Sequence, residues 1–267
     1  MAGGTIGRRA LRADRSCSPR CAGAWCFRRE AVCAGVDADA IGMSDVIIFC
    51  GPTLAGVGLP SAVRRQPPAA LGDMLAAAPK VPSTLILIDG LFGRQRSPWH
   101  KEILTLLSAG HRVVGAASMG ALRACELHQF GMIGVGVVFR AYRRGVLIDD
   151  GDVAVAHAPA ELGWRQLSVA MVDVLTALGR TRHAGAVDHA TACVIYDRAR
   201  AMSFKDRSWS KMLDGLPISG ELVRMLAAAP STKQADALRA VEFALHDSRW
   251  PLPPPAPPST RWERFLP

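Results

Sequence analysis

Short apolar runs alternate with more polar stretches through the first half of the chain. Residues 46–50, 84–88 and 111–116 are mainly apolar and contain many β-branched side chains. Runs of this length and composition are typical of strands that are buried on both faces of a parallel sheet. We therefore predict three buried strands in this part of the chain.

Helices are predicted between and after these strands. One is short and lies around 69–78. The next begins at Ser97-Pro98, where serine is a favourable N-cap and proline suits the first turn, and it ends at Gly110. A third spans 119–129. Strands and helices that alternate with short connections indicate the α/β class, here a parallel sheet with flanking helices in a Rossmann-like three-layer arrangement.

From about residue 160 the pattern becomes helical, with no further strand predicted. The predicted helices are 162–178, 184–202, 208–213, 219–227 and 232–246. We expect an α/β core domain over 43–155, followed over 156–249 by a helical region that packs on it.

The two ends of the chain differ from this core. Residues 1–42 hold seven arginines and no periodic apolar pattern, and Met43 stands just before the first strand. We expect Met43 to be the true start and 1–42 to be an over-called or disordered extension, with an Arg-rich transit peptide as the alternative. Residues 250–267 are predicted to form an extended, proline-rich tail.

Composition narrows the class of protein. The 267 residues are 49% hydrophobic and 21% charged, which excludes a wholly disordered chain. The net charge of +9 comes mostly from scattered arginines, so we expect no nucleic-acid partner, and no apolar stretch is long enough for a membrane helix. The seven cysteines match no zinc spacing and indicate a reducing compartment, so a cytoplasmic location is expected.

Polar residues follow the predicted strands at one edge of the sheet. Thr53, Asp89 and Ser118 each come just after a different strand, and His100 lies in the first turn of a helix near the same edge. Ligands of parallel α/β sheets bind outside the carboxyl ends of the strands. These four side chains are therefore predicted to converge on one crevice.

Ser118 carries the sharpest local signal. It is the serine of a small-x-Ser-x-Gly pattern between a strand and a helix, the setting of a nucleophile elbow. The alternative is that Ser118 is only a helix N-cap and that Gly120 lets helix and strand approach. His100 is the histidine placed to act as base, with Asp89 or Glu102 to orient it; its alternative is a polar residue without catalytic duty.

Charged residues near the crevice extend this site. Arg123 and Lys101 lie close enough to the helix starts to help hold an anion. The polar residue Thr53 is also expected to bind the anion. As an alternative, Arg123 and Glu126 have the spacing of a solvated ion pair.

An acidic stretch later in the chain leaves two alternatives open. Asp149, Asp150 and Asp152, with His157 nearby, have side chains that could bind Mg²⁺, but a turn and helix cap is the favoured interpretation. No phosphate-binding loop, zinc motif or haem motif occurs, so neither a cofactor nor a metal is predicted.

Several segments together carry a family resemblance. They are Phe49-Cys50-Gly51-Pro52-Thr53-Leu54, Asp89-Gly90-Leu91-Phe92, Trp99-His100-Lys101-Glu102-Ile103-Leu104, Ala117-Ser118-Met119-Gly120-Ala121-Leu122-Arg123-Ala124, Glu126-Leu127, Gly131-Met132, Gly134-Val135-Gly136 and the stretch from Asp149-Asp150 to Val153. They resemble the TfuA-like family, strongly over 46–155 and more loosely over 156–215.

The resemblance implies a role in modifying ribosomally made peptides, as in trifolitoxin biosynthesis. TfuA-like proteins are typically partners of YcaO enzymes, which use ATP to activate a backbone amide of a precursor peptide. The product of the paired systems is a backbone thioamide. The TfuA-like partner is thought to deliver sulfide, in one scheme by releasing it from a thiocarboxylated sulfur-carrier protein.

Hydrolysis of a thiocarboxylate is acyl transfer, which needs a nucleophile, a base and an oxyanion site. In this hypothesis Ser118 attacks the acyl carbon, the N–H groups of Met119 and Gly120 hold the oxyanion, and Arg123 offsets the negative carboxyl end. One alternative is a non-catalytic adaptor that docks on YcaO and binds an anion or the carrier tail. The other is a general serine hydrolase.

Overall fold

Five parallel strands form one sheet in the order β2-β1-β3-β4-β5. The strands are β1 (Val46–Phe49), β2 (Val63–Gln66), β3 (Thr84–Leu87), β4 (Arg112–Ala116) and β5 (Ile133–Val135). This computed structural model describes residues 46–91 and 96–246, so the predicted extension over 1–42 and the tail over 250–267 lie outside the described residues. The predicted α/β class and its parallel sheet are confirmed.

The two edge strands were not predicted. β2 contains the exposed Arg64 and Arg65, and β5 is only three residues long and contains Gly134. An edge strand is buried on fewer sides than a central one and so needs no apolar run. The hydrophobic pattern therefore reveals the central strands and passes over the edges.

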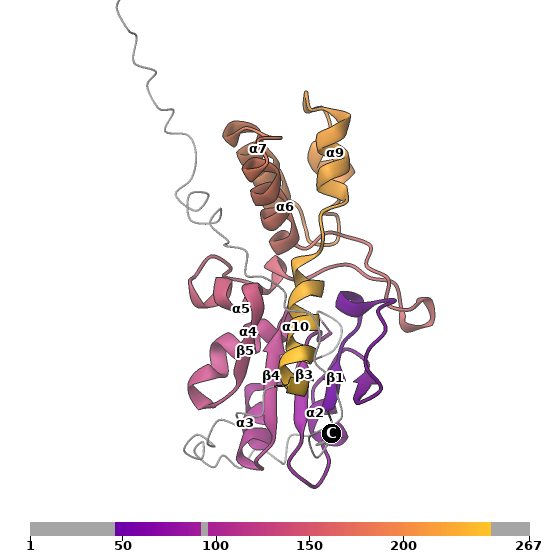
Figure 1. Cartoon of the computed structure of the whole chain (residues 1–267), viewed down its shortest axis with the longest axis vertical. Helices are drawn as coiled ribbons and strands as arrows, with labels where there is room; N and C mark the ends of the chain where they lie inside the picture. The colour runs from indigo at the N-terminus through magenta and orange to yellow at the C-terminus, as the bar shows by residue number, and fades with distance from the viewer. Residues whose placement is uncertain (1–45, 92–95, 247–267) are drawn as a thin grey trace, which may run out of the picture.

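Helices cover both faces of the sheet. On one face α2 (Asp73–Ala77), α3 (His100–Ser108) and α4 (Met119–Leu127) pack against apolar side chains such as Ile47 and Leu85. The other face, with Ile48, Ile86 and Val114, is covered by α10 (Thr232–His246), which runs along the front of β3 and β4 in Figure 1. The helix that covers this second face thus comes from the far end of the described chain.

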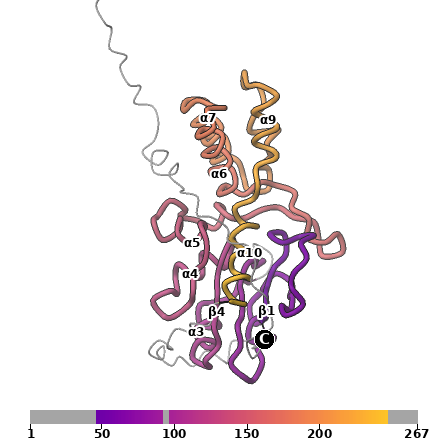
Figure 2. The backbone as a smooth tube through the Cα atoms, in the orientation of Figure 1, coloured from indigo at the N-terminus to yellow at the C-terminus, as the bar shows by residue number. Residues whose placement is uncertain are grey.

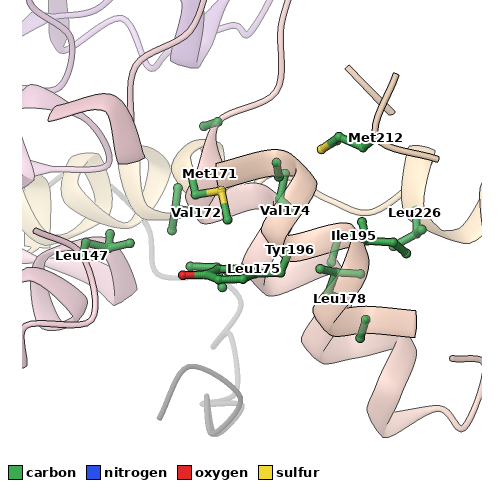
Figure 3. Close-up of a cluster of buried hydrophobic side chains, with 14 of the residues drawn as sticks. Leu147, Met171, Val172, Val174, Leu175, Leu178, Ile195, Tyr196, Met212 and Leu226 are labelled. Atoms are coloured by element: carbon green, nitrogen blue, oxygen red, sulfur yellow. The ribbon is translucent and has the colours of Figure 1, made fainter. Parts of the chain in front are cut away.

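The described chain also contains the helices α5 (Gly136–Arg143), α6 (Met171–His183), α7 (His189–Ala201), α8 (Trp209–Leu213) and α9 (Gly220–Ala227). It contains the short 3-10 helices η1 (Pro52–Leu54), η2 (His128–Phe130), η3 (Asp150–Asp152) and η4 (Ala160–Leu162) as well. α6, α7 and α9 stand beyond the end of the sheet at which η1 follows β1 (Figures 1 and 2). Their apolar sides form a core that includes Leu175, Ile195 and Leu226 (Figure 3) and continues onto α4 and α5.

The predicted helices of this region differ from the observed ones mainly at their starts. The helix predicted over 162–178 begins only at Met171, because Gly163 and Trp164 both have positive φ angles and interrupt any helix. The helices at 208–213 and 219–227 begin where expected, with Ser208 and Ser219 accepting hydrogen bonds as N-caps. In the described part of the chain, no helix is long and apolar enough to cross a membrane.

Candidate functional site

Asp89 and Thr53 meet where the strand order reverses between β1 and β3. The Asp89 carboxylate accepts hydrogen bonds from the N–H of Gly51 at 2.9 Å, the N–H of Thr53 at 3.0 Å and the Thr53 hydroxyl at 2.6 Å. Such a reversal is where open parallel sheets bind ligands. Thr53 was predicted to help hold an anion. Both of its donors, the N–H and the hydroxyl, are instead bonded to Asp89, so Thr53 supports this carboxylate.

Ser118 follows β4 on a strained turn. Ala117 has a φ of 66°, and the N–H of Ser118 donates to the carbonyl of Ala116 at 2.7 Å, which is the pattern of a γ-turn. The side chain of Ser118 does not cap α4, although the residue occupies the N-cap position. Only 2% of Ser118 is exposed, and its hydroxyl makes no hydrogen bond within the described residues. Backbone strain of this kind is frequent at functional sites.

Gly120 brings α4 into direct contact with β3. Its N–H donates to the carbonyl of Ile88 at 3.1 Å, and a Cβ atom at this position would lie 1.7 Å from the carbonyl oxygen of Leu87. The predicted close approach of helix and strand is therefore present. The N–H of Gly120 is already bonded, which corrects its predicted role as an oxyanion donor; the N–H of Met119 has no partner among the hydrogen bonds of the described residues.

The structure does not bring His100 to Ser118. His100 Nε2 lies 2.8 Å from a carboxylate oxygen of Glu126, which also accepts a hydrogen bond from Arg123 at 2.7 Å. Glu126 is eight residues beyond Ser118, about 12 Å along the axis of α4 at 1.5 Å per residue. His100, Glu126 and Arg123 thus form a separate, partly exposed cluster. Lys101 is exposed beside it.

Glu102 does not orient His100 either. Its buried carboxylate accepts hydrogen bonds from the N–H groups of Gly72, Met74 and Leu75 at 3.1, 3.0 and 3.3 Å. Burial raises the pKa of Glu102, and these backbone donors oppose the rise. Glu102 therefore closes the start of α2, which is a structural use of a carboxylate at a helix N-terminus.

A buried lysine, Lys233, lies close enough to Asp89 to be affected by its charge. Lys233, in the first turn of α10, is 1% exposed and donates to the carbonyl of Val153 at 2.7 Å. Burial lowers the pKa of Lys233, while the charges of Asp89 and then Asp173 oppose this. Asp173 itself, on α6, accepts hydrogen bonds from Ser231 and from the N–H of Thr232 at 3.0 and 2.7 Å.

Sequence reasoning passed over Lys233, although a signal was present. The apolar stripe of α10 contains Ala237, Ala240, Val241 and Ala244, and helical spacing extends it back to Lys233. A lysine within a buried stripe is unusual unless it has a partner. Its hydrogen-bond partner, the carbonyl of Val153, could not be named from the sequence, because the two residues are far apart along the chain.

The acidic stretch forms a helix cap. Asp149 and Asp152 form a capping box at η3, and the buried Asp152 is paired with Arg200. The favoured interpretation of a turn and cap is confirmed. In the ranges 46–91 and 96–246, no group of three or more His, Cys, Asp or Glu side chains is placed to hold a metal ion.

A hollow of about 430 Å³ lies elsewhere, beside β2 and α2. It is lined by Phe49, Arg64, Gln66 and Asp73 and their neighbours. None of the predicted site residues lines it.

The comparisons with known proteins agree with the sequence motifs. Residues 89–208 match a family model described as "TfuA-like protein". The match begins at Asp89 and includes Ser118, whereas Thr53 and Lys233 lie outside it. No curated protein matches the chain. The match confirms, over residues 89–208, the resemblance to the TfuA-like family that the sequence motifs indicate.

Proposed function

We propose that this protein is an accessory protein of ribosomal-peptide modification that works with a YcaO-type partner and delivers sulfide for backbone thioamide formation. In this proposal it releases sulfide from a thiocarboxylated sulfur-carrier protein by Ser118-dependent hydrolysis. One observation carries the proposal: a serine hydroxyl without a hydrogen-bond partner in the described residues follows a strained turn, at the strand edge where parallel sheets bind ligands. The TfuA-like match supports the biological setting.

The chemistry is acyl transfer in two steps. The Ser118 oxygen attacks the acyl carbon of the thiocarboxylate, the carbon–sulfur bond breaks, and the sulfur leaves as HS⁻ with the proton of the Ser118 hydroxyl. Water then hydrolyses the acyl ester, which releases the carrier as its carboxylate and restores the serine. The N–H of Met119, at the start of α4, is the donor available for the oxyanion.

The test follows sulfide release from a thiocarboxylated sulfur-carrier protein mixed with the purified chain. We expect Ser118→Ala to lower the rate at least about 100-fold without loss of fold. The matched control is Ser108→Ala on the surface of α3, which removes only a hydrogen bond to the carbonyl of Leu104 and should leave the rate unchanged. Full activity of the Ser118→Ala protein would remove Ser118 as nucleophile.

A non-catalytic adaptor is the second candidate. It is favoured by exposed apolar side chains on the helical region, Leu162, Leu167, Val194 and Val223, which suit contact with a protein partner. An adaptor predicts that the chain binds a YcaO protein and stimulates it, and that Ser118→Ala changes neither effect. Sulfide release by the purified chain alone separates the two functions.

A further inference from the structure

The outer edge of β2 carries backbone groups that have no partner in the described part of the chain. β2 stands at the end of the sheet order, next to β1. Gln66 faces β1, because its carbonyl accepts a hydrogen bond from the N–H of Cys50 at 3.1 Å. Successive residues of a strand direct their N–H and C=O groups to opposite sides, so both groups of Arg65 point away from β1. Within the described residues, neither of them makes a hydrogen bond.

The unpaired edge is short and has clear limits. The carbonyl of Val63 points to the same side as that of Arg65, whereas the N–H of Val63 is bonded to the carbonyl of Pro60 at 3.0 Å. Pro67 and Pro68 follow the strand, and proline has no N–H with which to continue the ladder. One donor and two acceptors are therefore open to a second strand along β2.

A hollow of about 430 Å³ lies beside this strand. Arg64 and Gln66 of β2 line it, together with Asp73 of α2. Gln66 is opposite Phe49 in the β1–β2 register, so these side chains stand on the face of the sheet that α2 covers. A strand added to β2 would direct alternate side chains to this face, next to the hollow. Open backbone groups beside a pocket are what strand addition uses to bind a peptide.

The charges of the edge select the occupant. β2 has two arginines and no acidic residue, and both arginines are exposed. Arg64 donates to the carbonyl of Ala77 at 3.0 Å, which uses one of the five N–H donors of its guanidinium. Asp73 accepts a hydrogen bond from the N–H of Ala70 at 2.7 Å. Pairing of this edge with a second copy of β2 would bring like charges together, whereas an acidic segment is attracted.

We propose that the outer edge of β2 binds an acidic peptide segment in an extended conformation, which adds a strand to the sheet. The backbone of the segment accepts a hydrogen bond from the N–H of Arg65 and donates to the carbonyls of Arg65 and Val63. An acidic side chain pairs with Arg64 beside the hollow. β2 is three strands from β4 in the sheet order, about 14 Å at 4.8 Å per strand, so this site is separate from Ser118. The inference goes beyond the proposed function and does not depend on it.

The experiment selects peptides from a phage-displayed library of short random sequences on the purified full chain. A selected peptide is then synthesised with a fluorophore, and its affinity is measured by fluorescence anisotropy. We expect the selected peptides to be acidic, and Arg64→Glu to weaken their binding about tenfold.

Two substitutions of Arg65 form a matched pair. Both Arg65→Pro and Arg65→Ala remove the side chain, but only proline also removes the outward N–H. Proline is tolerated on an edge strand where the N–H faces away from the sheet. We expect the selected peptide to bind Arg65→Pro about tenfold more weakly than Arg65→Ala, as for the loss of one hydrogen bond that leaves a carbonyl unpaired.

Amide hydrogen exchange of the unaltered chain gives a second readout, which holds even if Arg65→Pro does not fold. The bound peptide should slow exchange of the Arg65 N–H. Equal affinity of folded Arg65→Pro and Arg65→Ala, unchanged exchange at Arg65, or a selection that enriches no peptide would each overturn the proposal. Slowing of this exchange by a higher concentration of the chain alone would also overturn it, because the edge would then pair with a second copy.

Discussion

Replacement of Gly120 by alanine tests how closely α4 must approach the sheet. The added Cβ atom would lie 1.7 Å from the carbonyl oxygen of Leu87 and 2.6 Å from its carbonyl carbon. Side-chain Cβ atoms do not come closer than 3.0 Å to backbone, so α4 and β3 would have to separate by about 1.3 Å. No flexible side chain can absorb this shift, because both contacts are with backbone atoms.

The expected loss of stability follows from two effects. Overpacking of a tight interior site costs about 1–3 kcal/mol. Separation of the helix also breaks the hydrogen bond from the Gly120 N–H to Ile88, a further cost of about 1 kcal/mol. We expect Gly120→Ala to lower the free energy of unfolding by about 3 kcal/mol.

Urea unfolding followed by circular dichroism measures this difference. The matched control is Gly58→Ala, because a Cβ atom at Gly58 meets nothing within 4 Å and the backbone there is not in the left-handed region. This control should change stability by less than about 0.5 kcal/mol. A loss of less than about 1 kcal/mol for Gly120→Ala would show that helix and strand do not meet as closely as the structure has them.

Two further predictions concern residues whose roles the structure changes. The rate of serine-dependent sulfide release by His100→Ala should stay within about threefold of the original rate. Removal of a general base lowers the rate at least about 100-fold. A loss of that size in His100→Ala would show that His100 belongs to the active site. Burial raises the pKa of Glu102 in the folded chain above its unfolded value, so its contribution to stability is present at low pH and is lost as the pH rises through the raised pKa. Glu102→Gln should therefore weaken the decline in stability over that pH range, and unfolding curves measured at several pH values check this; an unchanged pH dependence would contradict the shift.

The central part of the fold could be predicted from local pattern alone. Strands β1, β3 and β4 are buried on both faces, so their sequences are almost continuously apolar. The helix starts were less predictable, because α3 begins at His100 after Trp99 and Ser97 does not cap it. The edge strands could not be found in this way, because β2 contains two adjacent arginines. Their place in the sheet depends on pairing with β1 and β4, which local sequence does not encode.

Only those site residues whose positions follow from the strand order could be predicted from the sequence. Asp89 and Ser118 follow neighbouring strands, so topology alone brings them to one edge. The partner of each carboxylate was not predictable, since Glu102 serves the start of α2 and Glu126, not Asp89, holds His100. Such choices depend on how α2, α3 and α4 lie against one another.

The groups around Asp89 come partly from outside the segment that carries the family match. Residues 89–208 contain Asp89 and Ser118, but the Asp89 carboxylate is held by Thr53 of η1, and Lys233 lies on α10 after the helical region. α10 is fixed at its start by Asp173 of α6. The surroundings of Asp89 therefore depend on the helical region as well as on the sheet, because α6 holds the start of the helix that carries Lys233.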